Sequence, residues 1–512
     1  MRQRRDPDTT QTRTRWTTNR GPNELQLQFP SWLTSLVLHA AALVILAIAT
    51  FPLPALPELA LQAALVEDES IEIDPQLFDL DVVLKPESLD ESVDQEIEIQ
   101  LQVDPRAVSL DAASVSPSEL EAEVIDFGAV TGDLGAISTP EGMSTSGLAG
   151  RGAASKAGLL VRGGGTRSSE KAVLRALDWL AQHQYPDGSW NFDHSQTECD
   201  GRCGNPGTLV EARAGATGLV LLAYLGAGYT HEEGRYKAQV YKGIYALGGL
   251  IKMDENGGSF WDPQGRMYSH GIATMAICEA YALTEDPALR EPAQAAINYI
   301  CYAQDPRGGG WRYNPREVGD TSVVGWQIGA LKSGYLSNLG VPPAAVHLAK
   351  DFLDTMMVDQ GSGYIYYLDP LNKSAAGPAV TAIGLLCQMF LGASRDDPGL
   401  ERGVDFLSKL GPSSTDVYFN YYAAQTLFHY TGGKGDVWTK WNEKMREMLV
   451  ATQLMEGHEV GSWTPAESGG HGNLEGGRLY TTAMSTMTLE VYYRMLPIYR
   501  PDAVAGEFEF DK

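Results

Sequence analysis

The stretch that decides the fold is residues 171–190, KAVLRALDWLAQHQYPDGSW. Apolar residues recur in it at helical spacing: Val173, Leu174, Leu177 and Leu180. An Asp-Gly pair then supplies a turn, and Trp190 follows directly behind it. The stretch therefore predicts an amphipathic helix, a glycine turn and an aromatic residue that closes the turn.

The same unit returns about every 53 residues, which is the signature of a repeat architecture. The later turns are GGSFW ending at Trp261, GGGW ending at Trp311, GSGYIY around Tyr364 and GSW ending at Trp463. A further copy at 401–416 keeps the helix and lacks the glycine-aromatic turn. Each unit continues into a second helix with small or apolar residues on nearly all of its faces, as in ARAGATGLVLLAYLGAG. A helix of this composition is typically buried on all sides. We therefore predict an all-α fold, an (α/α)6 toroid of six outer and inner helix pairs over residues 168–500.

Charge is distributed unevenly along the 512 residues, whose net charge is −26. Six arginines fall in residues 1–30, whereas residues 67–126 hold nineteen acidic residues against Lys85 and Arg106. No basic stripe occurs in the repeat region, which argues against a nucleic-acid partner. Residues 32–51 contain no Asp, Glu, Lys or Arg and are long enough for a helix to span a bilayer.

The arginines before this apolar run predict that it is a transmembrane helix with the N-terminus in the cytoplasm. A cleaved signal peptide is the alternative. The expected segments are a basic cytoplasmic tail at 1–30, a membrane helix at 31–52, an extended, disordered acidic linker at 53–126, a Gly/Ser-rich tether at 127–167, the toroid at 168–500 and an acidic tail at 501–512. The toroid is then outside a bacterial inner membrane.

The stretch 172–190 and the GGSFW, GGGW and GSW turns resemble the repeats of squalene and oxidosqualene cyclases. The region 168–500 as a whole resembles the terpenoid cyclase and protein prenyltransferase toroid superfamily, and is most similar to its squalene-cyclase-like bacterial members. The resemblance implies the fold and selects no activity, because unrelated proteins, polysaccharide lyases among them, use the same toroid.

The resemblance also identifies what this chain lacks. Cyclases of the superfamily protonate an alkene with the middle aspartate of a D-x-D-D-T motif, and the matching residues 317–321, EVGDT, have Gly319 at that position. Prenyltransferases hold Zn²⁺ with a D-x-C triplet and a later histidine, and no D-x-C occurs here. We expect no cofactor and no catalysis; if the protein is an enzyme, the candidate catalytic residues are Asp320, Glu317 and His270.

Alignment of the inner helices predicts a ligand site at one mouth of the ring. Arg213, His270 and Asp320 fall at equivalent positions near helix N-termini, and the same offset gives Gly377, Tyr418 and Tyr480. Converging polar groups in an apolar setting are typical of a binding site. The alternative is that the three charged or titratable residues cap helices or pair with one another. Trp326, Tyr421, Tyr422 and His471 are candidate wall residues, with core packing as the alternative.

Cys199 and Cys203 lie in the long loop after Trp190. In an oxidising exterior we expect them to form a disulfide. A Zn²⁺ site built from His194, Cys199 and Cys203 is the alternative, and free thiols are another. Cys278, Cys301 and Cys387 fall in apolar helical runs and are expected in the core.

The sequence therefore predicts a membrane-anchored, exported toroid that binds an apolar or isoprenoid ligand, or scaffolds an envelope protein partner. The alternative is an enzyme of the cyclase or prenyltransferase type, or an (α/α)6 carbohydrate-active enzyme.

The topology is tested by fusing alkaline phosphatase, which is active only outside the cytoplasm, after Lys512. We expect an active fusion in a bacterial host, because the arginines precede the apolar run and no Lys or Arg follows it until Lys85. An inactive fusion, together with an active cytoplasmic reporter at the same position, would reverse the orientation.

Overall fold

The computed structural model describes residues 151, 153–368 and 376–494. No helix within these residues is long and apolar enough to cross a membrane. The predicted basic tail, membrane helix at 31–52, acidic linker and C-terminal acidic tail lie outside the described residues.

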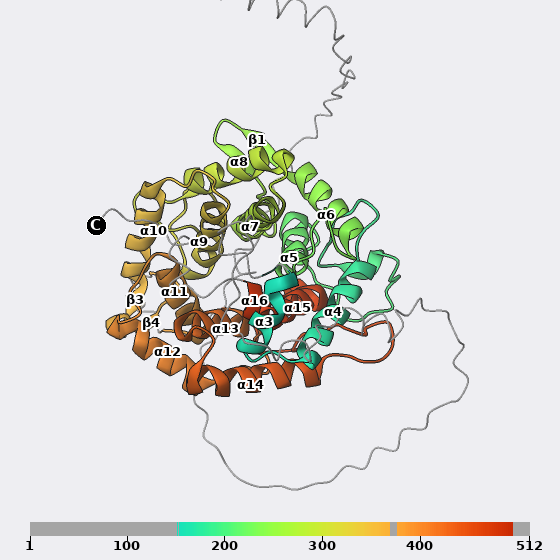
Figure 1. Cartoon of the computed structure of the whole chain (residues 1–512). Helices are drawn as coiled ribbons and strands as arrows, with labels where there is room; N and C mark the ends of the chain where they lie inside the picture. The colour runs from blue at the N-terminus through green and yellow to red at the C-terminus, as the bar shows by residue number, and fades with distance from the viewer. Residues whose placement is uncertain (1–150, 152, 369–375, 495–512) are drawn as a thin grey trace, which may run out of the picture. The chain divides into compact units, whose positions relative to one another are not determined.

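In the described part of the chain, six inner helices form a closed ring (Figure 1). They are α5 (Arg213–Gly226), α7 (Arg266–Thr284), α9 (Thr321–Leu336), α11 (Pro378–Phe390), α13 (Val417–Thr431) and α15 (Asn473–Leu489). Each packs against the next along the chain, and α15 returns to α5. The ring confirms the predicted inner helices and the toroid.

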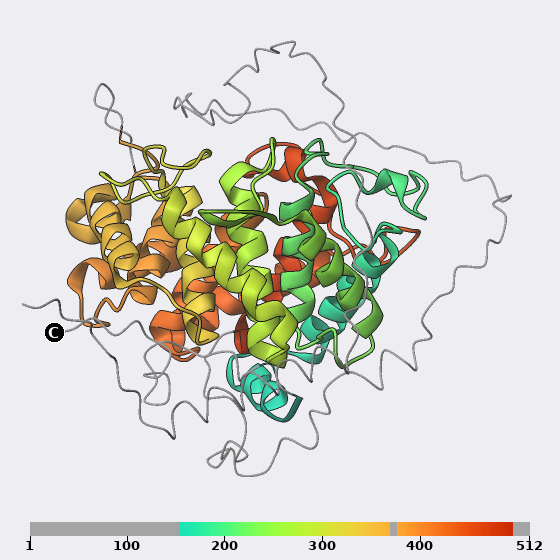
Figure 2. The same ribbon diagram turned by 90° about the horizontal axis from the view of Figure 1, so that it is seen from above.

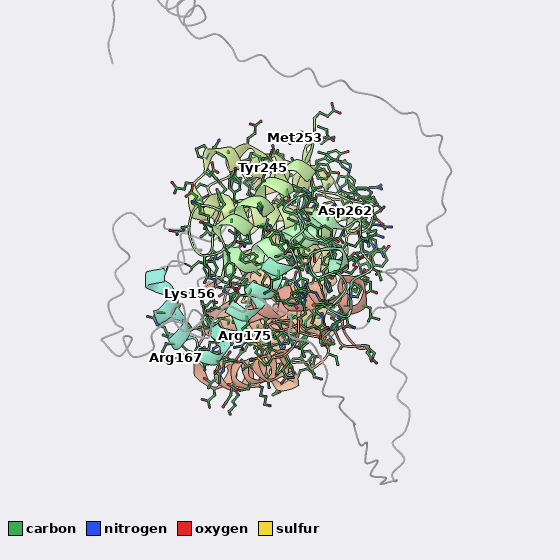
Figure 3. The ribbon with its side chains drawn as sticks, turned by 90° about the vertical axis from the view of Figure 1, so that its right-hand side faces the viewer. Lys156, Arg167, Arg175, Tyr245, Met253 and Asp262 are labelled. Carbon is green, nitrogen blue, oxygen red and sulfur yellow. The ribbon has the colours of Figure 1, made fainter. Side chains whose placement is uncertain are left out.

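The outer helices surround this ring and alternate with the inner ones in sequence (Figure 1). They are α4 (Arg167–Gln182), α6 (Lys237–Leu250), α8 (Pro287–Ala303), α10 (Pro343–Met356), α12 (Pro398–Leu410) and α14 (Gly435–Thr452). Proline stands at the start of α8, α10 and α12, where its missing N–H costs no helical hydrogen bond. Their outward faces are solvated, and Tyr245 and Met253 project from this surface (Figure 3).

Short hairpins join some of the pairs. Strand β1 (Lys252–Asp254) pairs antiparallel with β2 (Gly257–Ser259), and β3 (Met357–Val358) pairs with β4 (Gly363–Tyr364). Two short 3₁₀ helices, η4 (His194–Gln196) and η5 (Asp359–Gly361), lie in the connecting segments.

Glycine-aromatic turns tie outer helices to their inner partners in several copies. The indole N–H donates to a carbonyl in the last turns of the preceding outer helix in three copies: Trp190 to Leu180, Trp311 to Ile300 and Trp463 to Leu449, each at 2.8 Å. The backbone N–H of the aromatic residue donates to a threonine hydroxyl of the following inner helix in three copies: Trp190 to Thr217, Tyr364 to Thr381 and Trp463 to Thr482. The aromatic residues therefore complete the unit that the repeat predicts.

Small residues set the spacing of the inner helices. A Cβ on Gly218 of α5 would lie 2.8 Å from the Cα of Ala273 on α7, and one on Gly215 would lie 2.6 Å from Ser269 Oγ. The two contacts join residues that lie at similar distances from the first residue of each helix, so α5 and α7 run parallel. The backbones therefore approach more closely than any larger side chain would permit.

The C-terminal end of the ring is covered by α3 (Ala153–Arg162) and α16 (Val491–Arg494), and Figure 2 shows α3 at that end. Arg151 contributes a guanidinium that pairs with Glu279 of α7 at 2.7 Å, and Arg494 reaches the same carboxylate at 3.3 Å. All three side chains are buried. The predicted boundaries, a tether to 167 and a fold from 168, are therefore wrong, because a helix inside that stretch and Arg151 belong to the packed structure.

The close packing of α5 on α7 is tested by Gly218→Ala. The added methyl group must displace the Ala273 backbone, so we expect a loss of about 1–3 kcal/mol in the free energy of unfolding, measured by denaturant titration of the full-length chain. The matched control is Gly249→Ala on the exposed side of α6, where a Cβ meets nothing within 4 Å. We expect the control to be neutral or slightly stabilising. Equal effects of the two substitutions would contradict the packing argument.

Candidate functional site

The N-termini of the inner helices lie at one end of the ring, and polar residues gather there around α9 and α13. Asp320 caps α9 and Asp416 caps α13, each accepting a backbone N–H of its own helix. The hydroxyls of Ser322 and Tyr418 are 2.8 Å apart and join these two helices across the ring. Polar side chains of α9 and α13 therefore meet at the N-terminal end of the ring.

Asp320 is the most unusual group at this end. It is fully buried, and its Oδ1 accepts the Val323 N–H at 2.8 Å. Its Oδ2 lies 3.7 Å from Arg312 Nε and has no hydrogen-bond partner among the described residues. Burial raises the pKa of this carboxyl to about 7, against the opposing effects of the Val323 N–H and the Arg312 charge.

The N-terminus of α9 and the Arg312 charge both favour the ionised form of Asp320. The cap geometry is as expected, but the loss of hydration outweighs both favourable effects, because the whole carboxyl is inside the protein. At neutral pH the group is divided between its neutral and charged forms.

Tyrosines surround this carboxyl. The hydroxyls of Tyr313 and Tyr366 are 2.7 Å apart, and the Arg312 guanidinium lies over the ring of Tyr313 at 5.1 Å. Negative charge on Asp320 raises the pKa of Tyr268, Tyr313, Tyr366 and Tyr418, in each case in addition to the larger effect of burial. We call this group the mouth cluster: Tyr268, Arg312, Tyr313, Asp320, Tyr366 and Tyr418.

A second acid lies beside the mouth cluster. Asp416 Oδ2 is 2.6 Å from Nδ1 of His471, and this hydrogen bond raises the pKa of the imidazole. The imidazole is half-exposed and lies 5.9 Å from the ring of Tyr418. His471 is therefore at the rim of the mouth rather than in the core. Tyr480 is part-exposed on α15, and a Cβ on Gly472, the residue after His471, would lie 3.5 Å from its ring, so it is near the same rim.

Three other predicted residues do not join the mouth cluster. Arg213 begins α5, but its guanidinium pairs with Asp187 at 3.0 Å and packs over Tyr185, so it holds the first turn. His270 is buried between α7 and α8, where its Nδ1 accepts the Phe260 N–H at 3.1 Å. In this copy His270 accepts the backbone N–H that a threonine hydroxyl accepts in other copies. Burial lowers the pKa of His270 to about 3. Glu317 accepts the Asn314 N–H within its own loop at 2.9 Å.

Below the mouth the ring is filled with aromatic side chains. Trp326 of α9 stacks on Tyr421 of α13 with ring centroids 5.7 Å apart, and Tyr422 meets Trp326 edge-on at 5.9 Å. All three residues are buried. Gly377 caps α11 with its backbone only. Core packing is therefore the correct reading of Trp326, Tyr421 and Tyr422.

The position of the missing cyclase acid is closed to any side chain. A Cβ on Gly319 would lie 2.6 Å from the Cα of Gly310 and 2.8 Å from the backbone nitrogen of Trp311. The glycine is thus required by the contact between two backbone segments, so the structure has no room for a donor at this position.

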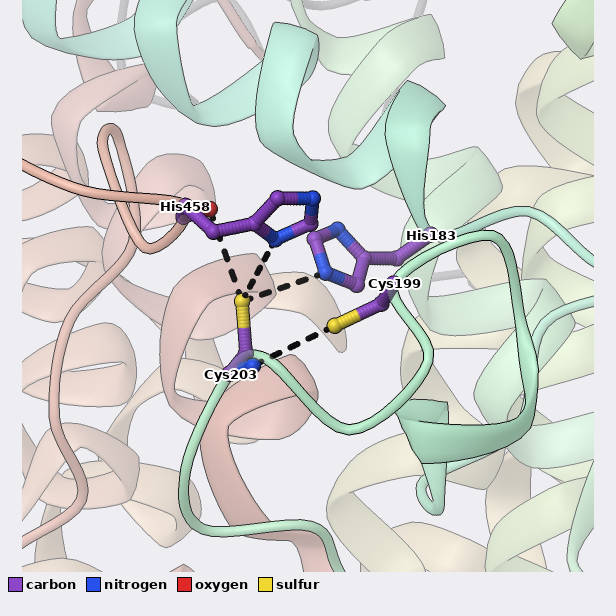
Figure 4. A group of neighbouring side chains, drawn as sticks. All are labelled: His183, Cys199, Cys203 and His458. Carbon is purple, nitrogen blue, oxygen red and sulfur yellow. Dashed lines mark hydrogen bonds between the residues drawn. The ribbon is translucent and has the colours of Figure 1, made fainter. Parts of the chain in front are cut away.

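Cys199 and Cys203 are both buried and both free, so the expected disulfide is not formed in the structure. They lie with His183 and His458, and the four ligand atoms are all within 4.8 Å of one another (Figure 4). His194, which we had grouped with the two cysteines, is near His183 with ring centroids 5.3 Å apart but is not one of the four. Burial lowers the pKa of His183 to about 3 and that of His194 to about 4.

Sequence reasoning missed several of these residues. Tyr313 follows the Trp311 turn by two positions, and Tyr366 lies in the corresponding place after Tyr364, so comparing the segments between each turn and its inner helix could have identified both. Arg312 lies in the same segment and could have been identified in the same way. No sequence pattern links His458 to the cysteine loop, because it is 255 residues from Cys203.

No protein-family model matches this sequence, and no curated protein matches it. Solved structures with a similar backbone include the GH76A α-1,6-mannanase from Salegentibacter sp. HEL1_6, at 14% identity and a TM-score of 0.45 over 64% of this chain and 98% of that one. A GH76 α-mannanase from Bacteroides thetaiotaomicron has 12% identity and a TM-score of 0.47 over 66% and 98%. The type II terpene cyclase MstE from Scytonema has 14% identity and a TM-score of 0.43 over 64% and 97%. These similarities carry no conclusion about activity.

The raised pKa of Asp320 predicts a pH dependence of stability. The ordinary pKa is 3.8 and the folded value is about 7, so the folded protein binds this proton more tightly than the unfolded chain. The stabilising contribution is therefore complete below about pH 4 and is lost as the pH rises through 7. Asp320→Asn keeps an N-cap acceptor without the titration. We expect the variant to remove on the order of 2 kcal/mol of the decline in unfolding free energy between pH 5 and pH 8.

The measurement is denaturant unfolding of the full-length chain at several pH values. The matched control is Asp405→Asn on α12, whose carboxylate is exposed and pairs with Lys409. An Asp320→Asn variant with the same pH profile as the wild type would show that Asp320 is ionised throughout.

Proposed function

We propose that this protein is an exported, membrane-tethered binding module, and that the mouth cluster is its ligand site. The observation that carries the proposal is Asp320: a buried carboxyl with one oxygen that lacks a hydrogen-bond partner among the described residues, near tyrosines whose pKa its charge raises. Buried polar atoms in native proteins nearly always have a partner, so an unpaired one at the mouth of a ring is a point where a ligand can bond.

The chemistry of the mouth cluster favours an uncharged ligand with an apolar body and a few hydroxyl or carbonyl groups. The tyrosine rings offer apolar faces, and their hydroxyls both donate and accept hydrogen bonds. Asp320 can donate from its neutral form and accept in its charged form. An anionic ligand would gain the Arg312 charge but would face the carboxylate of Asp320 at higher pH.

The filled interior supports binding at the mouth rather than enclosure of a long chain. Trp326 and Tyr421 stack about one turn below Ser322 and Tyr418, so side chains occupy the space between α9 and α13. Gly319 leaves no room for the acid that a cyclase of the resembling family uses. Both features favour recognition of a small ligand, or of the end of a larger one.

The apolar run at 31–52 and the acidic segment at 53–126 supply the rest of the proposal. They would anchor the chain in a bacterial inner membrane and hold the toroid on a long extracytoplasmic tether. From there it could meet an isoprenoid or other apolar ligand near the bilayer, or a protein of the envelope.

An enzyme remains the second candidate, and one observation favours it. A carboxyl with a pKa near 7 suits general acid catalysis at neutral pH, because both protonation states are populated. Asp320 would then be the proton donor, in place of the acid that cyclases have at the position of Gly319.

The binding site is tested by Asp320→Ala in the full-length chain. Small molecules that co-purify are extracted and quantified by mass spectrometry. Loss of one charge-assisted hydrogen bond is worth about 1.5–3 kcal/mol, so we expect about ten- to a hundredfold weaker retention. Asp405→Ala on the outer surface should retain as much as the wild type. Equal retention by both variants would remove the mouth cluster from the proposal.

Incubation of the full-length protein with squalene separates the two candidates. We expect no cyclic product by gas chromatography and mass spectrometry. Turnover by the wild type that disappears in Asp320→Asn would replace the binding module with an enzyme.

A further inference from the structure

A second group of chemically reactive side chains lies away from the mouth cluster. His183 caps the C-terminus of α4, Cys199 and Cys203 lie in the long loop that leads to α5, and His458 lies in the loop after α14 (Figure 4). Three segments, two of them more than 250 residues apart in sequence, therefore meet at one point. We propose that these four residues bind a structural Zn²⁺ ion that joins the first and last repeats of the ring.

The distances suit a tetrahedral site. Zn–S bonds of about 2.3 Å and Zn–N bonds of about 2.0 Å place neighbouring ligand atoms about 3.3–3.8 Å apart. Cys203 Sγ lies 3.1 Å from His458 Nδ1 and 3.4 Å from His183 Nε2, and all four ligand atoms fall within 4.8 Å of one another. Closing the widest separation to the tetrahedral value takes a shift of about 1 Å.

The ligands are already oriented by their neighbours. His183 Nδ1 donates to the Trp179 carbonyl at 2.6 Å, which leaves the lone pair on Nε2 toward Cys203. Its ring also stacks on Trp179 with centroids 3.9 Å apart. Metal-binding histidines usually donate their second N–H in this way, because it fixes both the tautomer and the ring orientation.

The cysteine loop has the form of a ligand loop. Asp200 and Gly201 adopt positive φ angles of 48° and 70°, so the chain turns back between the two cysteines. The Cys203 N–H then donates to Cys199 Sγ at 3.3 Å. A hydrogen bond of this kind stabilises a thiolate.

The charge around the four residues is balanced. Arg478 of α15 is buried next to the loop, where it bonds the Gly204 carbonyl at 2.9 Å and pairs with Glu459 at 2.9 Å. Binding exchanges two thiol protons for Zn²⁺, so two thiolates, two neutral imidazoles and the ion carry no net charge. A neutral, buried site with four protein ligands leaves no open position, which indicates a structural rather than a catalytic metal.

Two nitrogen and two sulfur ligands in a tetrahedral arrangement select Zn²⁺ over Mg²⁺ or Ca²⁺, which prefer oxygen. The position gives the ion a role in the fold. The inner ring closes where α15 meets α5, and the long loop crosses this seam: Thr208 N–H donates to the Glu475 carbonyl at 2.8 Å. The ion would fix the same seam through α4 and the loop after α14.

The test measures zinc in the full-length chain, purified without chelators, by inductively coupled plasma mass spectrometry. We expect about one zinc per chain in the wild type, and a loss of at least about tenfold in Cys203→Ser and in His458→Ala. His458→Cys should keep the metal, because a third thiolate can replace the imidazole. The matched controls are Cys301→Ser and His347→Gln on outer helices α8 and α10, which should bind as much zinc as the wild type. Co²⁺ added to the metal-free chain should give the thiolate charge-transfer absorption of a tetrahedral site.

Circular dichroism establishes that each variant is folded, and His458→Cys tests the site even where Cys203→Ser does not fold. Zinc below about one tenth of an equivalent in the wild type, with no uptake of added Zn²⁺ or Co²⁺ after reduction, would overturn the proposal. So would a Cys199–Cys203 disulfide that blocks alkylation in the purified chain, or zinc that is lost from His194→Gln and retained in His458→Ala. None of these residues belongs to the mouth cluster, so the outcome is independent of the proposed ligand site.

Discussion

The close approach of parallel inner helices is the constraint on which the rest of this structure depends. Glycines such as Gly215, Gly218 and Gly271 stand where a Cβ would meet the neighbouring helix at 2.5–2.8 Å. Because adjacent helices meet through small residues, six of them can form a ring within the described chain. The outer helices and the glycine-aromatic turns then hold each inner helix in position, through indole hydrogen bonds that recur from copy to copy.

Parallel inner helices give the ring two different ends. At the C-terminal end, buried guanidinium groups of Arg151 and Arg494 share the carboxylate of Glu279 and bond helix carbonyls, so this end is closed by ion pairs. At the N-terminal end, helix caps and turn segments bring acids and tyrosines together. Asp320 is placed there by its role as an N-cap, yet it is buried so deeply that desolvation dominates its pKa. A structural role and a chemically unusual environment therefore occur in one residue.

Much of the fold could be predicted because it is local and repeated. The period of the apolar residues, the Asp-Gly turn and the following tryptophan all lie within twenty residues of one another, and each copy supports the others. The same reasoning identified the inner helices and placed Asp320 near a helix N-terminus, while capping by Asp320 and core packing of Trp326 were its alternatives to a ligand site. It failed for His270, since the inner helices were aligned about one turn out of register: His270 and Thr217 are each the fifth residue of their helix, and the histidine replaces the threonine of other copies.

The sequence by itself determined the repeated helices of the ring, which of them are inner, and that polar residues stand near their N-termini, because periodicity and capping are properties of neighbouring residues. Only the tertiary structure decided that Arg312 and four tyrosines surround Asp320, that α3 and Arg151 belong to the fold, and that His458 meets Cys203. Most of those contacts join residues that are far apart in the chain, although Arg312 and Tyr313 are within eight residues of Asp320, and the pKa of Asp320 depends on the burial that the packing creates. Ring closure brings such residues together, and no local pattern records it.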